Sequence, residues 1–143
     1  MCFIDFLAIP FVSHGEDVAG IRKTLGPNGQ AIQILSKIDQ LDSVQRFNEI
    51  MEESDGAVFV RNELQWELSA EKLVLAQKWA ISEANAVAKP IIIQSQILES
   101  MVHSEEPDRR EMTEVSTVVL EGCDSLMLCH ETSIGKYPVQ AMN

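Results

Sequence analysis

The sequence has few basic residues: 11 lysines and arginines stand against 22 aspartates and glutamates, for a formal net charge of −11. Proteins that bind nucleic acid through its phosphates usually carry a concentrated positive patch. The composition therefore argues against nucleic-acid binding, and it also disfavours binding to an anionic membrane surface. An anionic small substrate requires a locally positive pocket, which the composition does not exclude.

Long hydrophobic runs and cysteine motifs are also missing. No stretch approaches the roughly 18 apolar residues of a membrane-spanning helix, and the opening MCFIDFLAIP is short, interrupted by Asp5 and without basic residues at its start. We therefore expect neither a membrane span nor a signal peptide. The cysteines, Cys2, Cys123 and Cys129, have no C-x-x-C spacing, which favours reduced thiols over a zinc or redox site. These absences predict a soluble, cytoplasmic protein.

Glycine is scarce, at 7 residues, and no glycine-rich phosphate loop follows the first apolar run. A dinucleotide-binding site needs such a loop between a strand and a helix, so this class of site is excluded. The 143 residues, 45% of them hydrophobic, are enough for one domain with a core. No linker or low-complexity tract divides the chain, and the polar segment His103–Glu111 is the one candidate mobile loop.

Five short apolar runs alternate with helical patterns along the chain. The runs are hydrophobic almost throughout, which is typical of parallel strands that are covered on both faces. They are Phe3–Val12, Ala31–Ile38, Ala57–Val60, Pro90–Gln94 and Ser125–Cys129. Repeats of strand and helix about 30 residues long predict an α/β protein, either a doubly wound sheet or part of a (β/α)8 barrel.

The segments between the runs have the apolar spacing of helices. A continuous apolar face predicts one helix over Leu41–Met51. Ser69 and Thr113 precede helical segments in the position of N-caps, and Gly122 is suited to end the second of these helices. Two further helices are predicted over Glu16–Leu25 and from Pro138 onward.

Ligands of both architectures bind at the carboxyl ends of the strands. Those ends hold Pro10–Phe11, Ser36–Asp39, Arg61–Glu63, Ser95–Gln96 and His130–Thr132. A lysine, a pair of carboxylates and a hydroxyl drawn from these segments suit a divalent cation with an anionic oxygen ligand, because carboxylates hold a hard cation and lysine neutralises negative charge. Charges at strand ends are also commonly only solvated. Lys37 is the exception, because it follows a hydrophobic run in which an uncompensated charge costs several kcal/mol.

Several motifs resemble one family. The segment IQILSKIDQLDSVQRFNEIMEESDGAVFVRNEL resembles the pyruvate kinase barrel, whose pattern there runs I-S-K-I-E-N…G-V…F-x-E-I…S-D-G…V-A-R-G-D-L-G. Downstream, AEKLVLAQK, KPIIIQSQILESM, PDRRE and CHETSIGKYP are similar to the family's later motifs, and DFLAIPFVSHGEDVAGIRKTLG is similar to an earlier one. The motifs occur in order and cover essentially the whole chain.

The resemblance implies a (β/α)8 barrel that transfers a phosphoryl group from phosphoenolpyruvate to ADP, giving pyruvate and ATP in glycolysis. The family uses Mg²⁺ or Mn²⁺ together with K⁺ and usually forms a homotetramer. Residues 1–143 then correspond to a single partial barrel domain, with about five of the eight units, from the fourth strand to the eighth helix. The residues of the nucleotide and K⁺ sites, the cap domain and the C-terminal domain have no counterpart in it.

The resemblance also implies roles for individual residues. Lys37 stands at the essential lysine, which stabilises the transferring phosphoryl group and the enolate. Asp39 and Glu63 stand at the two metal-ligand carboxylates, and Glu63 also belongs to the substrate site. Asn62 occupies the position of a glycine whose N–H binds the substrate carboxylate, and Ser95 that of a threonine beside the substrate.

Two departures from the family pattern affect this site. The metal positions exchange side-chain lengths, since the family has Glu where this chain has Asp39 and Asp where it has Glu63; each change moves a carboxylate by about 1.5 Å. Either the ion shifts toward Glu63, or Mg²⁺ is weakened in favour of the more tolerant Mn²⁺. In addition, Asn62 and Gln65 replace two glycines, and the Asn62 side chain enters space that the family leaves for substrate.

These observations leave three functional hypotheses. The first is a pyruvate kinase segment that carries the lysine and metal half-site and is inactive alone. The second is a non-catalytic interaction protein that associates, through its open sheet edges or its SEEPDRRE loop, with itself or with a full pyruvate kinase subunit. The third is another metal-dependent barrel enzyme, such as a lyase, acting on a small keto or enol acid, but the ordered motifs favour the kinase family over it.

Overall fold

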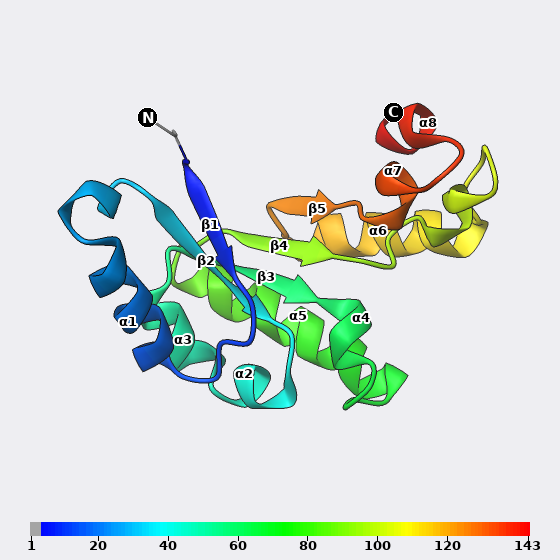
Figure 1. Cartoon of the computed structure of the whole chain (residues 1–143). Helices are drawn as coiled ribbons and strands as arrows, with labels where there is room; N and C mark the ends of the chain where they lie inside the picture. The colour runs from blue at the N-terminus through cyan, green and yellow to red at the C-terminus, as the bar shows by residue number, and fades with distance from the viewer. Residues whose placement is uncertain (1–3) are drawn as a thin grey trace.

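The computed structural model describes residues 4–143, so the predictions for Cys2 and Phe3 lie outside the described residues. The described chain forms one sheet of five parallel strands in the order β1-β2-β3-β4-β5 (Figure 1). The strands are β1 (Phe6–Ile9), β2 (Gln33–Ile38), β3 (Gly56–Val60), β4 (Ile91–Gln94) and β5 (Ser125–Met127). Each strand pairs with the next one along the chain, without the reversal of order that defines a doubly wound sheet. The sheet is therefore a segment of an α/β barrel, as one of the two sequence predictions stated.

Helices fill the connections between the strands. The longer ones are α1 (Gly15–Leu25), α3 (Phe47–Glu53), α5 (Ala70–Ala86) and α6 (Arg109–Glu121). The shorter ones are α2 (Leu41–Gln45), α4 (Arg61–Leu64), α7 (His130–Ser133) and α8 (Pro138–Met142), with 3₁₀ turns η1 (Pro27–Gly29) and η2 (Glu99–Val102). Figure 1 shows α1, α3 and α5 on the same side of the sheet. No helix in residues 4–143 combines the length and apolar character needed to cross a lipid bilayer.

The two faces of the sheet bury different residues. Ile34 and Ile38 of β2 and Phe59 of β3 belong to the main core with Phe47 of α3 and Ile81 of α5. The alternate residues of the same strands form a smaller cluster on the other face, which contains Leu35, Val58, Val60 and the partly buried Ile92. Because side chains alternate between the faces of a strand, Lys37 lies on this second face with Leu35 rather than against the helices.

Two helix predictions differ from the structure. The helix expected over Leu41–Met51 is divided into α2 and α3 at Arg46, which has φ −107° and ψ 21° and caps both helices. Thr113 was expected to start the fourth long helix but lies inside α6. Asp108 precedes α6, and the Glu111 carboxylate accepts the Asp108 N–H at 3.2 Å. The helix begins earlier because this D-x-x-E capping box satisfies its first amide groups.

Gly56 in β3 allows close packing between β3 and the chain that enters β4. A Cβ atom there would lie 2.7 Å from the carbonyl oxygen of Pro90 and 2.8 Å from Cδ2 of Leu35. We expect Gly56→Ala to lower the free energy of unfolding by about 1–3 kcal/mol, as overpacking does in other cores. Gly20→Ala is the matched control, since Gly20 lies in α1 with nothing within 4 Å of its Cβ position. Urea unfolding should show Gly20→Ala equal to or more stable than the unsubstituted chain, and equal losses in both variants would contradict the packing argument.

Candidate functional site

Lys37 and Asp39 lie two positions apart at the end of β2, so they face the same side of the sheet. Lys37 is partly buried, and Asp39 is buried with 5% of its surface exposed. The Asp39 Oδ2 atom accepts a hydrogen bond from the N–H of Phe11 at 3.1 Å. Its Oδ1 atom is buried and has no hydrogen-bond partner among the described residues. Buried carboxylate oxygens normally accept a hydrogen bond, so an oxygen atom without one indicates a place where a ligand binds.

Two other predicted site residues, Lys37 and Glu63, influence the pKa of Asp39. Burial raises the pKa of the Asp39 carboxyl above its ordinary value, against the lowering effects of the Phe11 hydrogen bond and the Lys37 charge. The negative charge of Glu63 raises it further. Lys37 in β2 and Glu63 in α4 therefore both act on the carboxyl group of Asp39, which directly follows β2.

Glu63 and Asn62 lie in α4, which begins directly where β3 ends. Both residues were predicted to lie at the tip of a strand, but they form one helical turn. The Asn62 Nδ2 atom donates to Oε1 of Glu63 at 3.3 Å. Arg61, at the start of α4, is 8% exposed and forms an ion pair with Glu114 of α6. This pair attaches the turn that carries Asn62 and Glu63 to a helix of the outer layer.

Ser95 follows β4 and has a positive φ of 71°, as does the next residue, Gln96, at 55°. Non-glycine residues seldom adopt this conformation, and such strain often occurs at functional sites. The Ser95 Oγ atom lies 3.5 Å from Sγ of Cys129. Ser95 and Asn62 line a common cavity of about 470 Å³, whereas Lys37 and Asp39 do not line it.

Seven further residues, to which the sequence assigned no role in binding, also line the cavity. Gln65, Trp66, Gln94, Gln96, Glu99, Cys129 and His130 complete its lining. Gln96 and His130 belong to the strand ends identified in the sequence, and Gln65 stands where the family pattern has a glycine. Buried Glu131 supports this region, because its carboxylate accepts the N–H groups of Cys129 at 2.7 Å and Leu98 at 3.2 Å.

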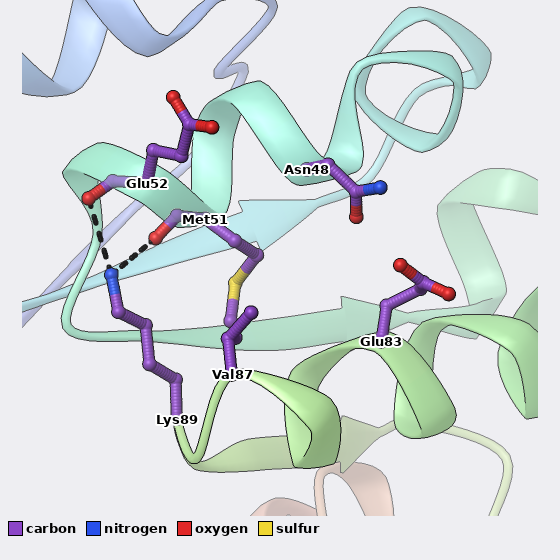
Figure 2. Close-up of a pocket in the computed structure, with 6 residues that line it drawn as sticks. All are labelled: Asn48, Met51, Glu52, Glu83, Val87 and Lys89. Atoms are coloured by element: carbon purple, nitrogen blue, oxygen red, sulfur yellow. Dashed lines mark hydrogen bonds between the residues drawn. The ribbon is translucent and has the colours of Figure 1, made fainter.

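A second cavity, of about 460 Å³, lies between α3 and α5 at the other end of the sheet (Figure 2). Lys89 reaches from the loop before β4, and its Nζ donates to the carbonyl oxygens of Met51 and of Glu52, the latter at 3.1 Å. These carbonyls lie in the last turn of α3, where backbone acceptors have no partner within the helix. The ammonium group therefore satisfies a helix end. Because ligands of α/β barrels bind at the opposite, carboxyl edge, this cavity is not the candidate active site.

Comparison with known proteins decides the family. A profile described as "Pyruvate kinase, barrel domain" matches residues 2–142. The chain is 44% identical over 140 residues to the pyruvate kinase of Dictyostelium discoideum, covering 98% of this chain and 28% of the relative. It is 43% identical over 139 residues to human pyruvate kinase PKLR, covering 97% of this chain and 24% of the relative. It is 42% identical over 139 residues to a pyruvate kinase of Glycine max named as a cytosolic isozyme, covering 97% of this chain and 27% of the relative.

The chain belongs to the pyruvate kinase family. It spans about a quarter of the length of the curated relatives it matches. The match confirms the resemblance inferred from the motifs, and it agrees with the sheet order, which is that of a barrel segment.

The pyruvate kinase family implies a divalent cation, and the residues near β2 and α4 fit one. Asp39 offers a buried oxygen atom without a partner, and Glu63 is a second carboxylate that acts on it electrostatically. No group of three or more histidine, cysteine, aspartate or glutamate side chains in residues 4–143 is arranged to hold a metal. A protein site with one or two carboxylates is nevertheless usual for Mg²⁺, which keeps several water ligands and binds substrate oxygens.

Asp39 and Asp55 should affect stability in opposite directions. Burial raises the pKa of Asp39 above about 3.8, so its stabilising contribution is full below that pH and is lost as the pH rises through the folded-state pKa. Partial burial also acts on Asp55, but hydrogen bonds from Arg22 and from the Ile34 N–H, each of 2.7 Å, outweigh it and lower its pKa. Its contribution is present above about 3.8 and is lost as the pH falls through the folded-state pKa.

We therefore expect Asp39→Asn to make the metal-free chain more stable at pH 7 and Asp55→Asn to make it less stable. Urea unfolding of both variants at pH 7 and near pH 3 measures this. The gain from Asp39→Asn should shrink at the lower pH, as should the loss from Asp55→Asn. Loss of stability at pH 7 in both variants would mean that the buried, ionised carboxylate of Asp39 does not destabilise the folded chain.

Proposed function

We propose that this chain provides the lysine and metal half-site of a phosphoryl-transfer enzyme that converts phosphoenolpyruvate and ADP to pyruvate and ATP. The observation that carries the proposal is the buried Asp39 Oδ1 atom, which has no partner among the described residues and is influenced by the charges of Lys37 and Glu63. A cation site next to a lysine suits a phosphoryl group, since most of the catalysis of phosphoryl transfer is positioning and charge stabilisation.

Each residue then has a specific role. Asp39 and Glu63 hold Mg²⁺ or Mn²⁺, and Lys37 stabilises the negative charge of the phosphoryl group and of the enolate left after transfer. When bound, the cation neutralises charge on the oxygens of the substrate. The N–H of Asn62 and the hydroxyl of Ser95 contact the substrate from the cavity that they share. The K⁺ and nucleotide sites of the family require residues outside these 143.

We expect the 143-residue chain to form no pyruvate alone, because it supplies only this half-site. The proposal is therefore tested in a completed barrel, made by replacing the 140 matching residues of the Dictyostelium discoideum enzyme with those of this chain. A coupled assay should detect pyruvate formation that depends on Mn²⁺ or Mg²⁺. A folded chimera that forms no pyruvate, beside an active parent enzyme, would refute the proposed function.

A second candidate function is non-catalytic association with another barrel segment. The outer edges of β1 and β5 pair with no strand within residues 4–143. Phe6 on β1 is 57% exposed, and Met127 on β5 is 38% exposed. Unpaired strand edges are templates for pairing with another chain, so the partner would be a second copy or a complete pyruvate kinase subunit.

Size-exclusion chromatography and a pull-down with an intact pyruvate kinase subunit test this second candidate. It predicts either a dimer or larger species of the chain, or retention of the chain by the subunit. A monomer that the subunit does not retain would exclude it. We propose the cytoplasm as the place of either activity, supported by the Glycine max relative that is named a cytosolic isozyme.

A further inference from the structure

Asn62 supplies a second unpartnered oxygen at the carboxyl edge of the sheet. Its Oδ1 atom is buried and accepts no hydrogen bond from residues 4–143, and the same is true of Oδ1 of Asp39. The Nδ2 atom of Asn62 donates to Oε1 of Glu63 at 3.3 Å. The opposite orientation of the amide would place two oxygen atoms against each other, because a carboxylate only accepts hydrogen bonds. The amide oxygen of Asn62 is therefore directed away from this carboxylate oxygen.

The two unpartnered oxygen atoms belong to neighbouring strand ends. β2 and β3 pair in parallel, with Ile38 opposite Phe59. Asp39 directly follows β2, and α4, which contains Asn62, directly follows β3. Because neighbouring strands are roughly 4.8 Å apart, Asp39 and the turn α4 leave the sheet side by side. The charge of Glu63 in the same turn acts on the carboxyl group of Asp39, as this placement requires.

Two acceptors cannot satisfy each other, because a hydrogen bond needs a donor. Lys37 acts on Asp39 through its charge but donates no hydrogen bond to its Oδ1 atom. A buried acceptor without a partner destabilises the fold, so a donor or a cation is expected at this place. A divalent cation fits best, since its two charges balance those of Asp39 and Glu63. An amide oxygen is a ligand of the same hard type as a carboxylate oxygen.

We propose that the Oδ1 atom of Asn62 is a third protein ligand of the divalent cation that Asp39 and Glu63 hold, an inference that rests on the proposed function. The glycine of the family pattern has no side-chain oxygen at this position, so the replacement by asparagine adds the ligand. Because an octahedral ion has six positions, three protein oxygens leave about three of them for water or for substrate oxygens. The chain then binds the cation without substrate.

The test measures Mn²⁺ binding by the 143-residue chain and by its Asn62→Ala variant, after circular dichroism has established that each is folded. Calorimetry gives the affinity, and water-proton relaxation gives the number of water molecules on the bound ion. Asn62→Ala should bind Mn²⁺ at least about 10-fold more weakly. A water molecule should take the vacated position, so the bound ion should carry about one more water than in the unsubstituted chain. A residue that only orients Glu63 through its N–H group would not change the number of waters.

Asn62→Asp separates the oxygen of this side chain from its N–H group. Aspartate has the same shape and keeps an oxygen in place, but its carboxylate cannot donate to Glu63. The variant should bind Mn²⁺ more tightly than the unsubstituted chain, because it adds a charged ligand. Gln94 is the matched control, a carboxamide of the same cavity that lies opposite Val60 in the sheet. Gln94→Ala should change the affinity by less than about 2-fold, and Gln94→Glu, which adds charge but no ligand, should gain less than Asn62→Asp.

Each other outcome overturns a defined part. If Mn²⁺ binds and Glu63→Ala weakens its binding, but Asn62→Ala does not both weaken binding and add a water molecule, the inference fails and the proposed function stands. The inference also fails if Asn62→Asp binds Mn²⁺ no more tightly than Gln94→Glu. If the folded chain binds no Mn²⁺, or Glu63→Ala leaves the affinity unchanged, the proposed half-site fails, and the inference fails with it.

Discussion

Lys37→Met is expected to lower the rate of pyruvate formation by the completed barrel by about 10²- to 10³-fold, the usual effect of removing one group that stabilises developing negative charge. Lys37 lies on the face of β2 that is turned away from the helices, and its positive charge lowers the pKa of Asp39. Methionine keeps the length and the apolar stem of the side chain but removes the ammonium. The variant therefore tests charge with little change in packing.

Two readouts separate this effect from misfolding. Lys72→Met, at an exposed position of α5, removes a lysine of the same chain away from the site and should leave the rate nearly unchanged. The Mn²⁺ affinity of Lys37→Met should be equal to or higher than that of the unsubstituted protein, because removing a nearby positive charge does not weaken a cation site. A rate within about 3-fold of the unsubstituted chimera would contradict the role of Lys37.

Exchanging the two carboxylates should change the metal preference of the completed barrel. Mg²⁺ requires near-octahedral geometry with distances close to 2.1 Å, and a carboxylate displaced by one carbon–carbon bond does not meet it. We therefore expect the chimera to work better with Mn²⁺ than with Mg²⁺. The double variant Asp39→Glu, Glu63→Asp, which has the side-chain lengths implied by the family pattern, should raise the Mg²⁺-supported rate at least about 10-fold.

The single variants are the controls for this exchange. Asp39→Glu alone gives two long side chains and Glu63→Asp alone gives two short ones, so neither should reach the Mg²⁺-supported rate of the double variant. The effects of the two substitutions on the Mg²⁺-supported rate should thus be coupled rather than additive, as expected of residues that share one ligand. Additive effects of the single variants, or an unchanged ratio between the metals, would mean that the two carboxylates do not bind the same ion.

The positions of the strands were predictable because each strand is a short, local apolar run. The continuous apolar runs indicated parallel strands, and β2, β3 and β4 lie within or next to the predicted ranges. The choice between a barrel segment and a doubly wound sheet was left open by the pattern alone. It depends on which strands pair, and this information lies in contacts between residues far apart in the chain.

The ends of elements were harder to predict than the elements themselves. The apolar face of Leu41–Met51 does not reveal the break at Arg46, because Val44 of α2 packs against the same core as the apolar residues of α3. Thr113 was preferred as a cap, although the Asp108 and Glu111 capping box was present in the sequence. The turn α4 was missed because four residues are too few for a periodic pattern.

The candidate site was predicted in part. Position at strand ends and the family motifs selected Lys37, Asp39 and Glu63, and the charges of Lys37 and Glu63 act in opposite directions on the pKa of Asp39. The hydrogen bond between the side chains of Gln65 and Gln96 was not predicted, because the two residues are 31 positions apart in the chain. Likewise, no sequence pattern shows that one oxygen of Asp39 is buried without a partner. That atom is nevertheless the main support for a cation site.

Calorimetric titration of the 143-residue chain with Mn²⁺, beside the Glu63→Ala variant, tests the half-site most directly. Glu63 is exposed in α4, so its truncation should leave the fold intact, and a circular dichroism spectrum checks this. The unsubstituted chain should bind close to one equivalent of Mn²⁺ in a saturable reaction, and Glu63→Ala should bind at least about 10-fold more weakly. Identical isotherms for the two proteins would contradict the assignment of Asp39 and Glu63 as a metal site.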